Sequence, residues 1–146
     1  MSSWRDSASA EAQSDLDGLL EFLLDFAQGQ LAKRGSLAPF GAAVGATGEP
    51  RLIAAVPPDG TGEISGTLLI STLVDGLRAQ RPTLRAAGIG FDVRLPGEGR
   101  DAISVDLEHR EGQSMRVLLP YAKNRSGGIE YFDLRAGPST RRVWTE

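Results

Sequence analysis

The sequence predicts an α+β fold, a two-layer sandwich in which an antiparallel sheet of five to six strands carries two helices on one face. Two kinds of periodicity predict it. Apolar residues recur at three- and four-residue spacing in residues 14–34 and 65–80, as in amphipathic helices. Apolar and polar residues alternate through most of residues 83–121, as in antiparallel strands with one buried and one solvated face. Packing both helices on one sheet face would bury both apolar stripes.

The first helix is predicted to begin at Ser14 and to end at Gly35. Ser14 and Asp17 have the spacing of a capping arrangement, and Gly35 suits a left-handed C-cap. The residues before it, 1–13, are rich in Ser and Ala and are predicted to be disordered. The apolar stripe of the helix consists of Leu16, Leu19, Leu20, Leu23, Phe26, Ala27 and Leu31.

Residues 38–56 predict two short strands joined by a turn at 47–50. The first strand is rich in Gly and Ala, which indicates a strand lying directly under a helix. A further turn is predicted at Pro57–Gly60, followed by the second helix over 65–80, which Pro82 terminates.

The three long strands are separated by residues 96–100 and by residues 111–113, and residues 128–134 predict an additional edge strand. Odd-numbered side chains in this half are predicted to face the helices and even-numbered ones to face water. The domain is therefore expected to span residues 14–134. Residues 135–146 form a C-terminal tail whose Trp144 could pack back onto it.

Residues of the same face must pair across a hairpin, which constrains the register of the strands. In the last hairpin this places Glu108 opposite Arg116. In the preceding hairpin Phe91 is predicted opposite Val105, because the alternative register would set two aspartates against each other.

Composition excludes several classes of function. The chain has no Cys, so zinc–thiolate sites, disulfides and thiol nucleophiles are absent. A net charge of −3 argues against nucleic-acid binding, which usually requires a basic surface. No apolar run has the length of a membrane span, and the first residues lack the pattern of a secretory signal. We expect a cytoplasmic protein with no membrane partner and no cofactor.

His109 is the only histidine and therefore the one candidate for acid–base chemistry near neutral pH. It shares its parity with Val105 and Leu107, so the favoured interpretation is a half-buried residue at the rim of the core. The alternative is a ligand-binding role.

Three carboxylates, Asp92, Asp106 and Glu108, are predicted on one face of the sheet and could be imagined as a metal site or an acid–base pair. Arg94 and Arg116 are interleaved with them on the same face. A charge-balanced ladder of this kind is typical of a solvated surface, so no metal site and no catalytic residue is predicted.

The segment after the third long strand is the most suggestive of a ligand. It places Tyr121, Lys123, Asn124 and Arg125 before a Gly-Gly pair at 127–128, and basic side chains with glycine amides could bind an anion. No Walker-type or dinucleotide-type spacing is present. The alternative interpretation is a solvated turn.

The strings FLLDFAQGQLAKRGSLAPFGAAV, AAGIGFDVRLP and DAISVDLEHREGQSMRVLLPYAKNRSGGIEYFDL resemble small bacterial proteins that consist of a domain of unknown function. The resemblance covers about residues 14–134. It implies a bacterial origin and a single domain, and it implies no activity. The order of elements is also similar to that of roadblock-type and profilin-like modules, in topology only.

A well-specified scaffold without a catalytic constellation favours a non-enzymatic protein-interaction or accessory module, for example an immunity-like protein, that binds another protein or forms a homodimer. The alternative is a small-ligand or anion-binding protein, or a weak hydrolase, that uses the Tyr121–Arg125 loop and His109.

Overall fold

The computed structural model describes residue 6 and residues 8–53 and 66–145. Within these residues lie two long helices, one 3-10 helix over Arg81–Thr83 and seven strands, so the predicted α+β class is confirmed. The long helices are α2 (Ala10–Arg34) and α3 (Gly66–Gln80). The strands are β1 (Phe40–Gly45), β2 (Pro50–Ile53), β3 (Leu84–Leu95), β4 (Arg100–His109), β5 (Ser114–Lys123), β6 (Ile129–Tyr131) and β7 (Arg135–Pro138).

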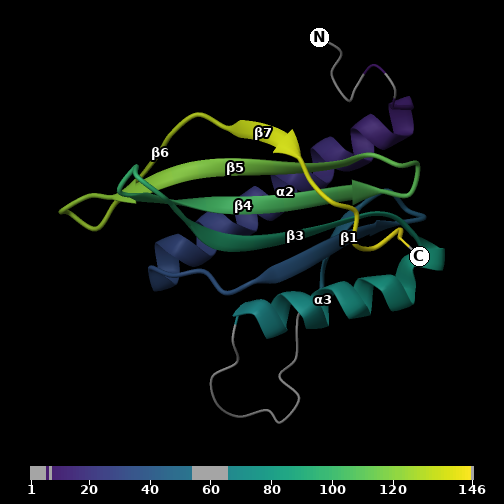
Figure 1. Ribbon diagram of the computed structural model, residues 1–146, viewed down its shortest axis with the longest axis horizontal. Coiled ribbons are helices and arrows are strands. Elements are labelled where there is room, and N and C mark those ends of the chain that lie inside the picture. Colours follow the sequence, from purple (N-terminus) through teal and green to yellow (C-terminus); the bar gives the residue numbers. More distant parts are fainter. Residues whose placement is uncertain (1–5, 7, 54–65, 146) are drawn as a thin grey trace.

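The strands form one curled antiparallel sheet in the order β2-β1-β3-β4-β5-β6 (Figure 1). β7 also pairs with β5, so β6 and β7 share one edge of that strand. The predicted edge strand is thus confirmed at 129–131. It is followed by a second short strand that begins inside the predicted tail.

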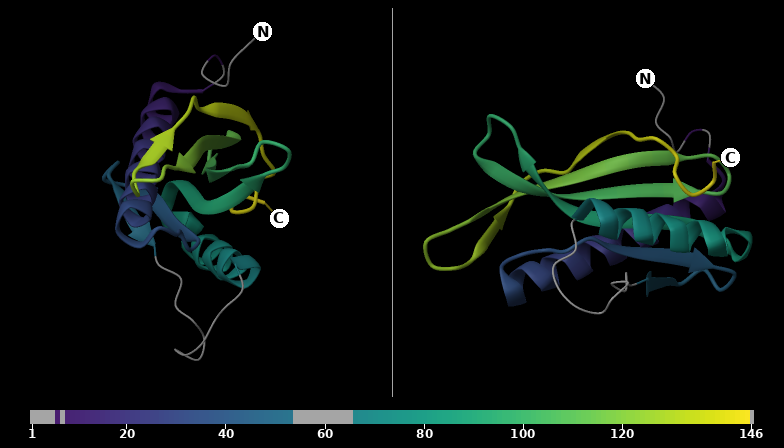
Figure 2. Two further views of the ribbon diagram at one scale, coloured as in Figure 1. Left: turned by 90° about the vertical axis from the view of Figure 1, so that its left-hand side faces the viewer. Right: turned by 60° about the horizontal axis from the view of Figure 1, so that its bottom comes forward.

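The two helices cover opposite faces of the sheet, so the prediction that both lie on one face is wrong (Figure 2). α2 packs on one face of β1, β3, β4 and β5, and α3 packs on the other face of β1 and β3. Glycines allow this close double cover. A Cβ on Gly88 would lie 2.5 Å from Leu23 Cδ1 of α2, and one on Gly41 would lie 3.3 Å from Leu73 Cδ2 of α3.

The cause of this error is the turn between β3 and β4. The predicted five-residue loop pairs odd residues with odd ones, but the strands are joined through Pro96–Gly99. Phe91 therefore lies opposite Ser104, not Val105. Ala87, Ile89 and Phe91 of β3 therefore face α3, while the odd residues Ile103, Val105 and Leu107 of β4 face α2.

The hairpin of β4 and β5 keeps the predicted parity, but its register differs from the predicted one by two residues. Asp106, and not Glu108, lies opposite Arg116. The shift arises because the turn is centred on Glu111, with Gly112 N donating to His109 O at 3.0 Å.

The first helix begins earlier than predicted. Its N-cap is Ser9, whose hydroxyl accepts from Ala12 N at 3.0 Å, and the helix runs from Ala10. The predicted cap at Ser14 is therefore wrong, because residues 10–13 are strong helix formers and extend the helix backwards. The predicted end is confirmed, since Gly35 adopts a left-handed conformation (φ 72°).

Part of the predicted organisation lies outside the described residues, namely residues 1–5 and 7 of the predicted disordered segment, the end of the second strand, the turn at 57–60 and the predicted helix start at Ser65. Among the described helices, none has the length and apolar character needed to cross a membrane.

Candidate functional site

His109 lies at the end of β4 and is fully buried under α2, so the predicted half-buried position is wrong. It contacts a carboxylate that the sequence did not single out. Its Nε2 is 3.0 Å from Oδ2 of Asp15, which is 3% exposed. Arg85 of β3 donates to the same carboxylate from Nε, 3.0 Å to Oδ2, and from an Nη, 2.5 Å to Oδ1. Hydrogen bonding to Asp15 raises the pKa of Arg85, so the guanidinium stays charged.

The second ring nitrogen of His109 fixes the tautomer. Nδ1 accepts a hydrogen bond from the main-chain N–H of Glu111 at 3.1 Å, so it carries no proton. Nε2 must therefore carry the proton and donate a hydrogen bond to Asp15 Oδ2. The imidazole is neutral, and both of its nitrogens are occupied by protein groups.

Asp15, Arg85 and His109 form a buried triad. It connects α2 to β3 and β4 and gives His109 a structural role. An Asp–His pair also occurs in nucleophilic catalysis, but there the second nitrogen faces a hydroxyl or thiol, which the Glu111 amide replaces here. The sequence did hold a signal for Asp15, because it lies one residue before Leu16 and four before Leu19, on the buried stripe of α2.

The loop candidates are placed by the structure but do not converge. Tyr121 is buried, and its hydroxyl donates to Asp92 Oδ1 at 2.8 Å. Lys123 Nζ donates to the main-chain oxygen of Gly35, at the end of α2. Asn124 Oδ1 accepts from the amides of Ser126 and Gly128 at 3.1 and 2.8 Å and so holds the turn closed.

Arg125 is exposed at the tip of this turn, and His109 lies at the other end of the sheet. Tyr121 pairs with Asp101 near the start of β4, about 26 Å from His109 at a rise of about 3.3 Å per residue. A single small ligand cannot contact both. Around Tyr121 itself, burial raises the pKa of the phenol and also that of Asp92.

A second buried carboxylate, Glu108, lies on the other face of the sheet. Glu108 of β4 is 6% exposed and faces the α3 side of the sheet, where residues 139–145 cross it. We call these residues the strap. Glu108 Oε2 accepts from Val143 N at 2.7 Å and Arg142 N at 3.3 Å, and Oε1 accepts from Trp144 N at 3.1 Å.

The strap is also held from its other side. Arg81, in the 3-10 helix that follows α3, donates from Nη1 to Val143 O at 2.9 Å and to Thr145 O at 2.7 Å. The hydroxyl of Ser114 donates to Ser139 O at 2.8 Å. The main chain of Val143 is therefore bound through both its N–H and its carbonyl, although the strap forms no strand there.

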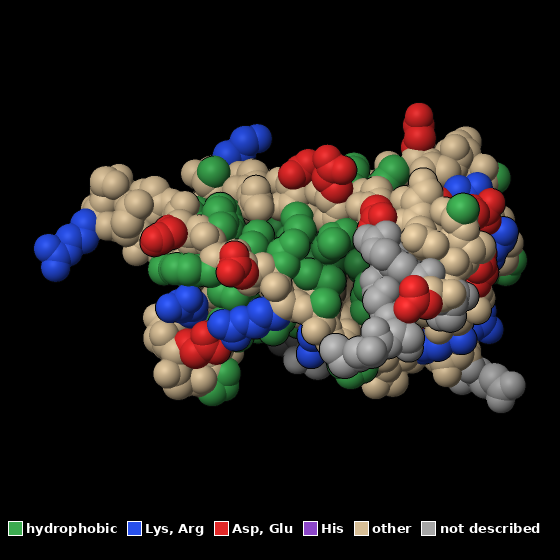
Figure 3. Space-filling view, turned by 90° about the horizontal axis from the view of Figure 1, so that it is seen from above, with side chains coloured by type: hydrophobic (Ala, Val, Ile, Leu, Met, Phe, Trp, Pro, Cys, Tyr) green, Lys and Arg blue, Asp and Glu red, His purple; other side chains and the backbone are tan. Residues whose placement is uncertain are grey.

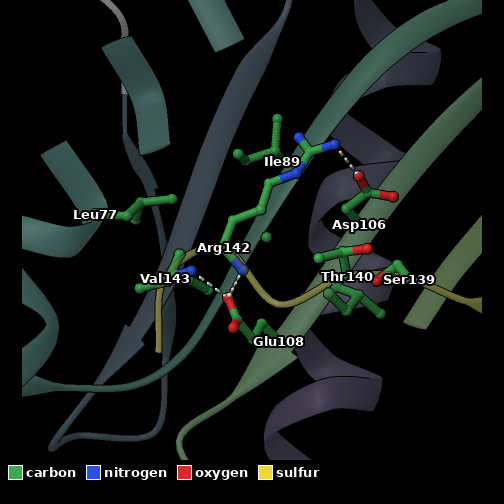
Figure 4. Close-up of a pocket in the computed structure, with 11 residues that line it drawn as sticks. Leu77, Ile89, Asp106, Glu108, Ser139, Thr140, Arg142 and Val143 are labelled. Atoms are coloured by element: carbon green, nitrogen blue, oxygen red, sulfur yellow. Dashed lines mark hydrogen bonds and ion pairs between the residues drawn. The ribbon is translucent and has the colours of Figure 1, made fainter. Parts of the chain in front are cut away.

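Side chains of the strap complete the contact (Figure 4). Val143 is 3% exposed and belongs to the cluster of Leu77, Ala87 and Ile89, with Trp144 packed partly against it. The cavity that remains beside it measures only about 20 Å³. The strap thus fills a groove closely. We call it the strap groove, and it is formed by Leu77, Arg81, Ala87, Ile89 and Glu108.

The strap groove continues into open space along α3. Arg142 Nη2 lies 3.7 Å from Asp106 Oδ2, and Arg116 donates twice to the same carboxylate, at 2.6 and 2.9 Å. Beyond them an open depression of about 450 Å³ is lined by these two arginines, by Phe91 of β3 and by one face of α3.

The predicted carboxylate ladder is therefore wrong in two respects. Asp92 faces the α2 side, while Asp106 and Glu108 face the α3 side, because β3 has the opposite parity to β4. Glu108 is buried and not solvated, because the strap covers it. The alternation of β4 carries no signal for this cover, which comes from residues more than thirty positions later.

An apolar groove lies on the opposite side of the sheet, between α2 and the edge formed by β5 and β7. It measures about 160 Å³, and Figure 3 shows hydrophobic side chains gathered on this face. Leu134 on its rim is 52% exposed. Its apolar lining includes Leu16, Leu20, Met115, Val117, Leu134 and Ala136.

Comparisons with known proteins give no further identification: the chain matches no protein-family model, no curated protein and no solved structure. The resemblance to small bacterial proteins and to roadblock-type or profilin-like topology stays a prediction.

Proposed function

We propose that the protein is a non-enzymatic interaction module that binds an extended segment of a partner protein in the strap groove. One observation carries the proposal: a buried carboxylate, Glu108, accepts hydrogen bonds from three consecutive main-chain N–H groups of a non-strand segment. Main-chain groups occur in every polypeptide, so a groove built to bind them suits a peptide better than a small molecule.

The groove also has the other features of peptide recognition. Arg81 binds carbonyls on the opposite side of the segment, and an apolar pocket takes one side chain. In the structure this groove is occupied by residues of the same chain. The strap is thus an internal example of what the groove binds.

A small-ligand or anion-binding function at Tyr121–Arg125 has weaker support. The tyrosine hydroxyl, the lysine ammonium and the asparagine amide each have a partner within the fold, and only Arg125 extends into solvent without a recorded contact among the described residues. A protein-interaction role is also favoured by the apolar groove beside Leu134, since exposed apolar patches often mark association surfaces.

Binding in trans tests the proposal. The full chain carrying Val143→Asp places a charge in the apolar pocket and so loosens the strap, while every residue of the groove stays unchanged. A fluorescent peptide of residues 137–145 should bind to this variant, as measured by anisotropy. It should bind at least about tenfold more weakly to the unchanged chain, because a segment in cis competes at a roughly millimolar effective concentration.

The milder variant Val143→Ser serves if Val143→Asp loses its native circular-dichroism spectrum. A peptide that itself carries Val143→Asp is the control and should not bind. Absence of binding of the unmodified peptide to a folded variant would refute the proposed function.

A further inference from the structure

The strap groove discriminates among segments at specific positions, an inference that rests on the proposed function. Its main-chain contacts carry no sequence information, because Glu108 and Arg81 bind N–H and C=O groups. Discrimination must come from the side chains at strap positions 141–144, and three of these have defined surroundings.

The pocket at position 143 accepts a compact branched apolar side chain. Val143 is 3% exposed and packs against Leu77, Ala87 and Ile89, and the cavity that remains beside it measures only about 20 Å³. A smaller side chain would leave a void, and a much larger one would force the pocket apart. A charged side chain would be buried without a partner.

The two preceding positions lie beside carboxylates. Arg141 Nε donates to Glu108 Oε1 at 3.3 Å, and Arg142 Nη2 lies 3.7 Å from Asp106 Oδ2. The two arginine side chains are 35% and 39% exposed, so each attraction is modest. An acidic side chain at position 141 or 142 would instead lie beside the carboxylate of Glu108 or of Asp106, respectively, so the strap groove disfavours acidic segments.

We propose that the partner of the strap groove is an extended protein segment with one or two basic residues directly before a compact branched apolar residue, and that Arg141–Val143 of the strap is its competitor in cis. Figure 4 shows this arrangement, with the Arg142 side chain turned to Asp106 and the Val143 main chain turned to Glu108.

A panel of peptides tests the pattern on the full chain carrying Val143→Asp, with Val143→Ser as the second host. Each peptide spans residues 137–145. Val143→Ala should weaken binding by about 15-fold, the equivalent of two buried CH₂ groups. Arg142→Glu should weaken it by more than about fivefold, and added salt should reduce this difference because the charges are partly exposed. A Thr140→Ala peptide is the control, since the Thr140 side chain makes no recorded polar contact within the described residues. This peptide should bind as the parent peptide does.

The groove side of the same pattern is tested with Asp106→Asn in the host chain. This change should reduce the discrimination against Arg142→Glu to less than about twofold. Asp101→Asn is the matched control, because Asp101 lies on the same strand and also pairs with an arginine, Arg94, but faces the α2 side. It should leave the discrimination unchanged.

The outcomes separate the two proposals. If every peptide binds with similar affinity, the proposed pattern is wrong, while peptide binding itself stands. The same holds if Asp106→Asn has no more effect than Asp101→Asn. If no peptide binds to either folded host, the proposed function fails, and the pattern fails with it.

Discussion

The side-chain oxygen Oε2 of Glu108 lies 2.7 Å from the main-chain nitrogen of Val143, and the two residues come from the end of β4 and from the strap. Both are buried, at 6% and 3% exposure. A carboxylate in such surroundings is stable only if hydrogen-bond donors replace its hydration. Here the donors are three consecutive main-chain amides of the strap, so this one side chain holds the strap at residues 142–144.

The first prediction concerns this side chain. Glu108→Gln replaces one carboxylate oxygen by an NH₂ group that cannot accept from the strap amides, and it removes the charge. We expect the free energy of unfolding to fall by about 2 kcal/mol, the range for hydrogen bonds to a charged group. Urea denaturation measures it, and hydrogen exchange should accelerate at the amides of 142–144.

Glu130→Gln is the matched control, since Glu130 is exposed on β6. Its effect should stay within about 0.5 kcal/mol. Equal effects of the two substitutions, or unchanged exchange at 142–144, would show that Glu108 does not hold the strap.

The second prediction concerns the buried triad. Asp15→Asn removes the charge that compensates Arg85 and should lower the free energy of unfolding by about 3 kcal/mol, the lower end for breaking a buried pair, because the Arg85 side chain is 18% exposed. Glu21→Gln, on an exposed position of the same helix, should change it by less than about 0.5 kcal/mol.

The tautomer of His109 offers an independent check on the triad. Long-range ¹H–¹⁵N correlation spectra should show a protonated Nε2 and an unprotonated Nδ1 near neutral pH, because Nδ1 accepts from Glu111 N. A doubly protonated ring, or the opposite tautomer, would be inconsistent with this assignment.

Periodicity predicted the elements of this fold well and their faces less well. The stripe of α2 and the apolar, inward face of β4 and β5 depend only on local spacing, and both were interpreted correctly. The orientation of β3 depended on whether the turn at Pro96–Gly99 contains an even or an odd number of residues, which composition does not determine. Because the turn has an even number of residues and not the predicted odd number, Phe91 and α3 lie on the face opposite α2.

The candidate site was harder to predict for a related reason. Asp15 and His109 each follow the buried pattern of their own element, so their pairing could have been anticipated. Glu108 follows a solvated pattern and is buried only because the strap returns over it. Such long-range cover leaves no trace in the spacing of β4.

The third prediction concerns Tyr121. Burial, with the hydrogen bond to Asp92 adding to it, raises the pKa of the phenol above its ordinary value of about 10. The raised pKa means that folding favours the neutral phenol. The resulting stability is fully present below about pH 10 and is lost as the pH rises through the folded-state pKa.

Tyr131→Phe isolates this titration, because the chain has two tyrosines and Tyr121 is then the only one. Tyrosinate absorbance of the folded variant should appear well above pH 10, and in urea it should appear near pH 10. A native titration that coincides with the unfolded one would contradict the buried, hydrogen-bonded position of Tyr121.

The fourth prediction compares two glycines that differ in their surroundings. A Cβ on Gly88 would lie 2.5 Å from Leu23 Cδ1 and 3.1 Å from Leu107 Cδ2, so Gly88→Ala should lower the free energy of unfolding by about 1–3 kcal/mol through overpacking under α2. A Cβ on Gly76 of α3 would meet no atom within 4 Å. Gly76→Ala should therefore raise the free energy of unfolding by about 0.4–1 kcal/mol, because alanine restricts the unfolded chain and favours the helix. Thermal and urea denaturation of both variants measure the pair. A Gly88→Ala variant that is as stable as the parent chain would contradict the packing of β3 directly beneath α2.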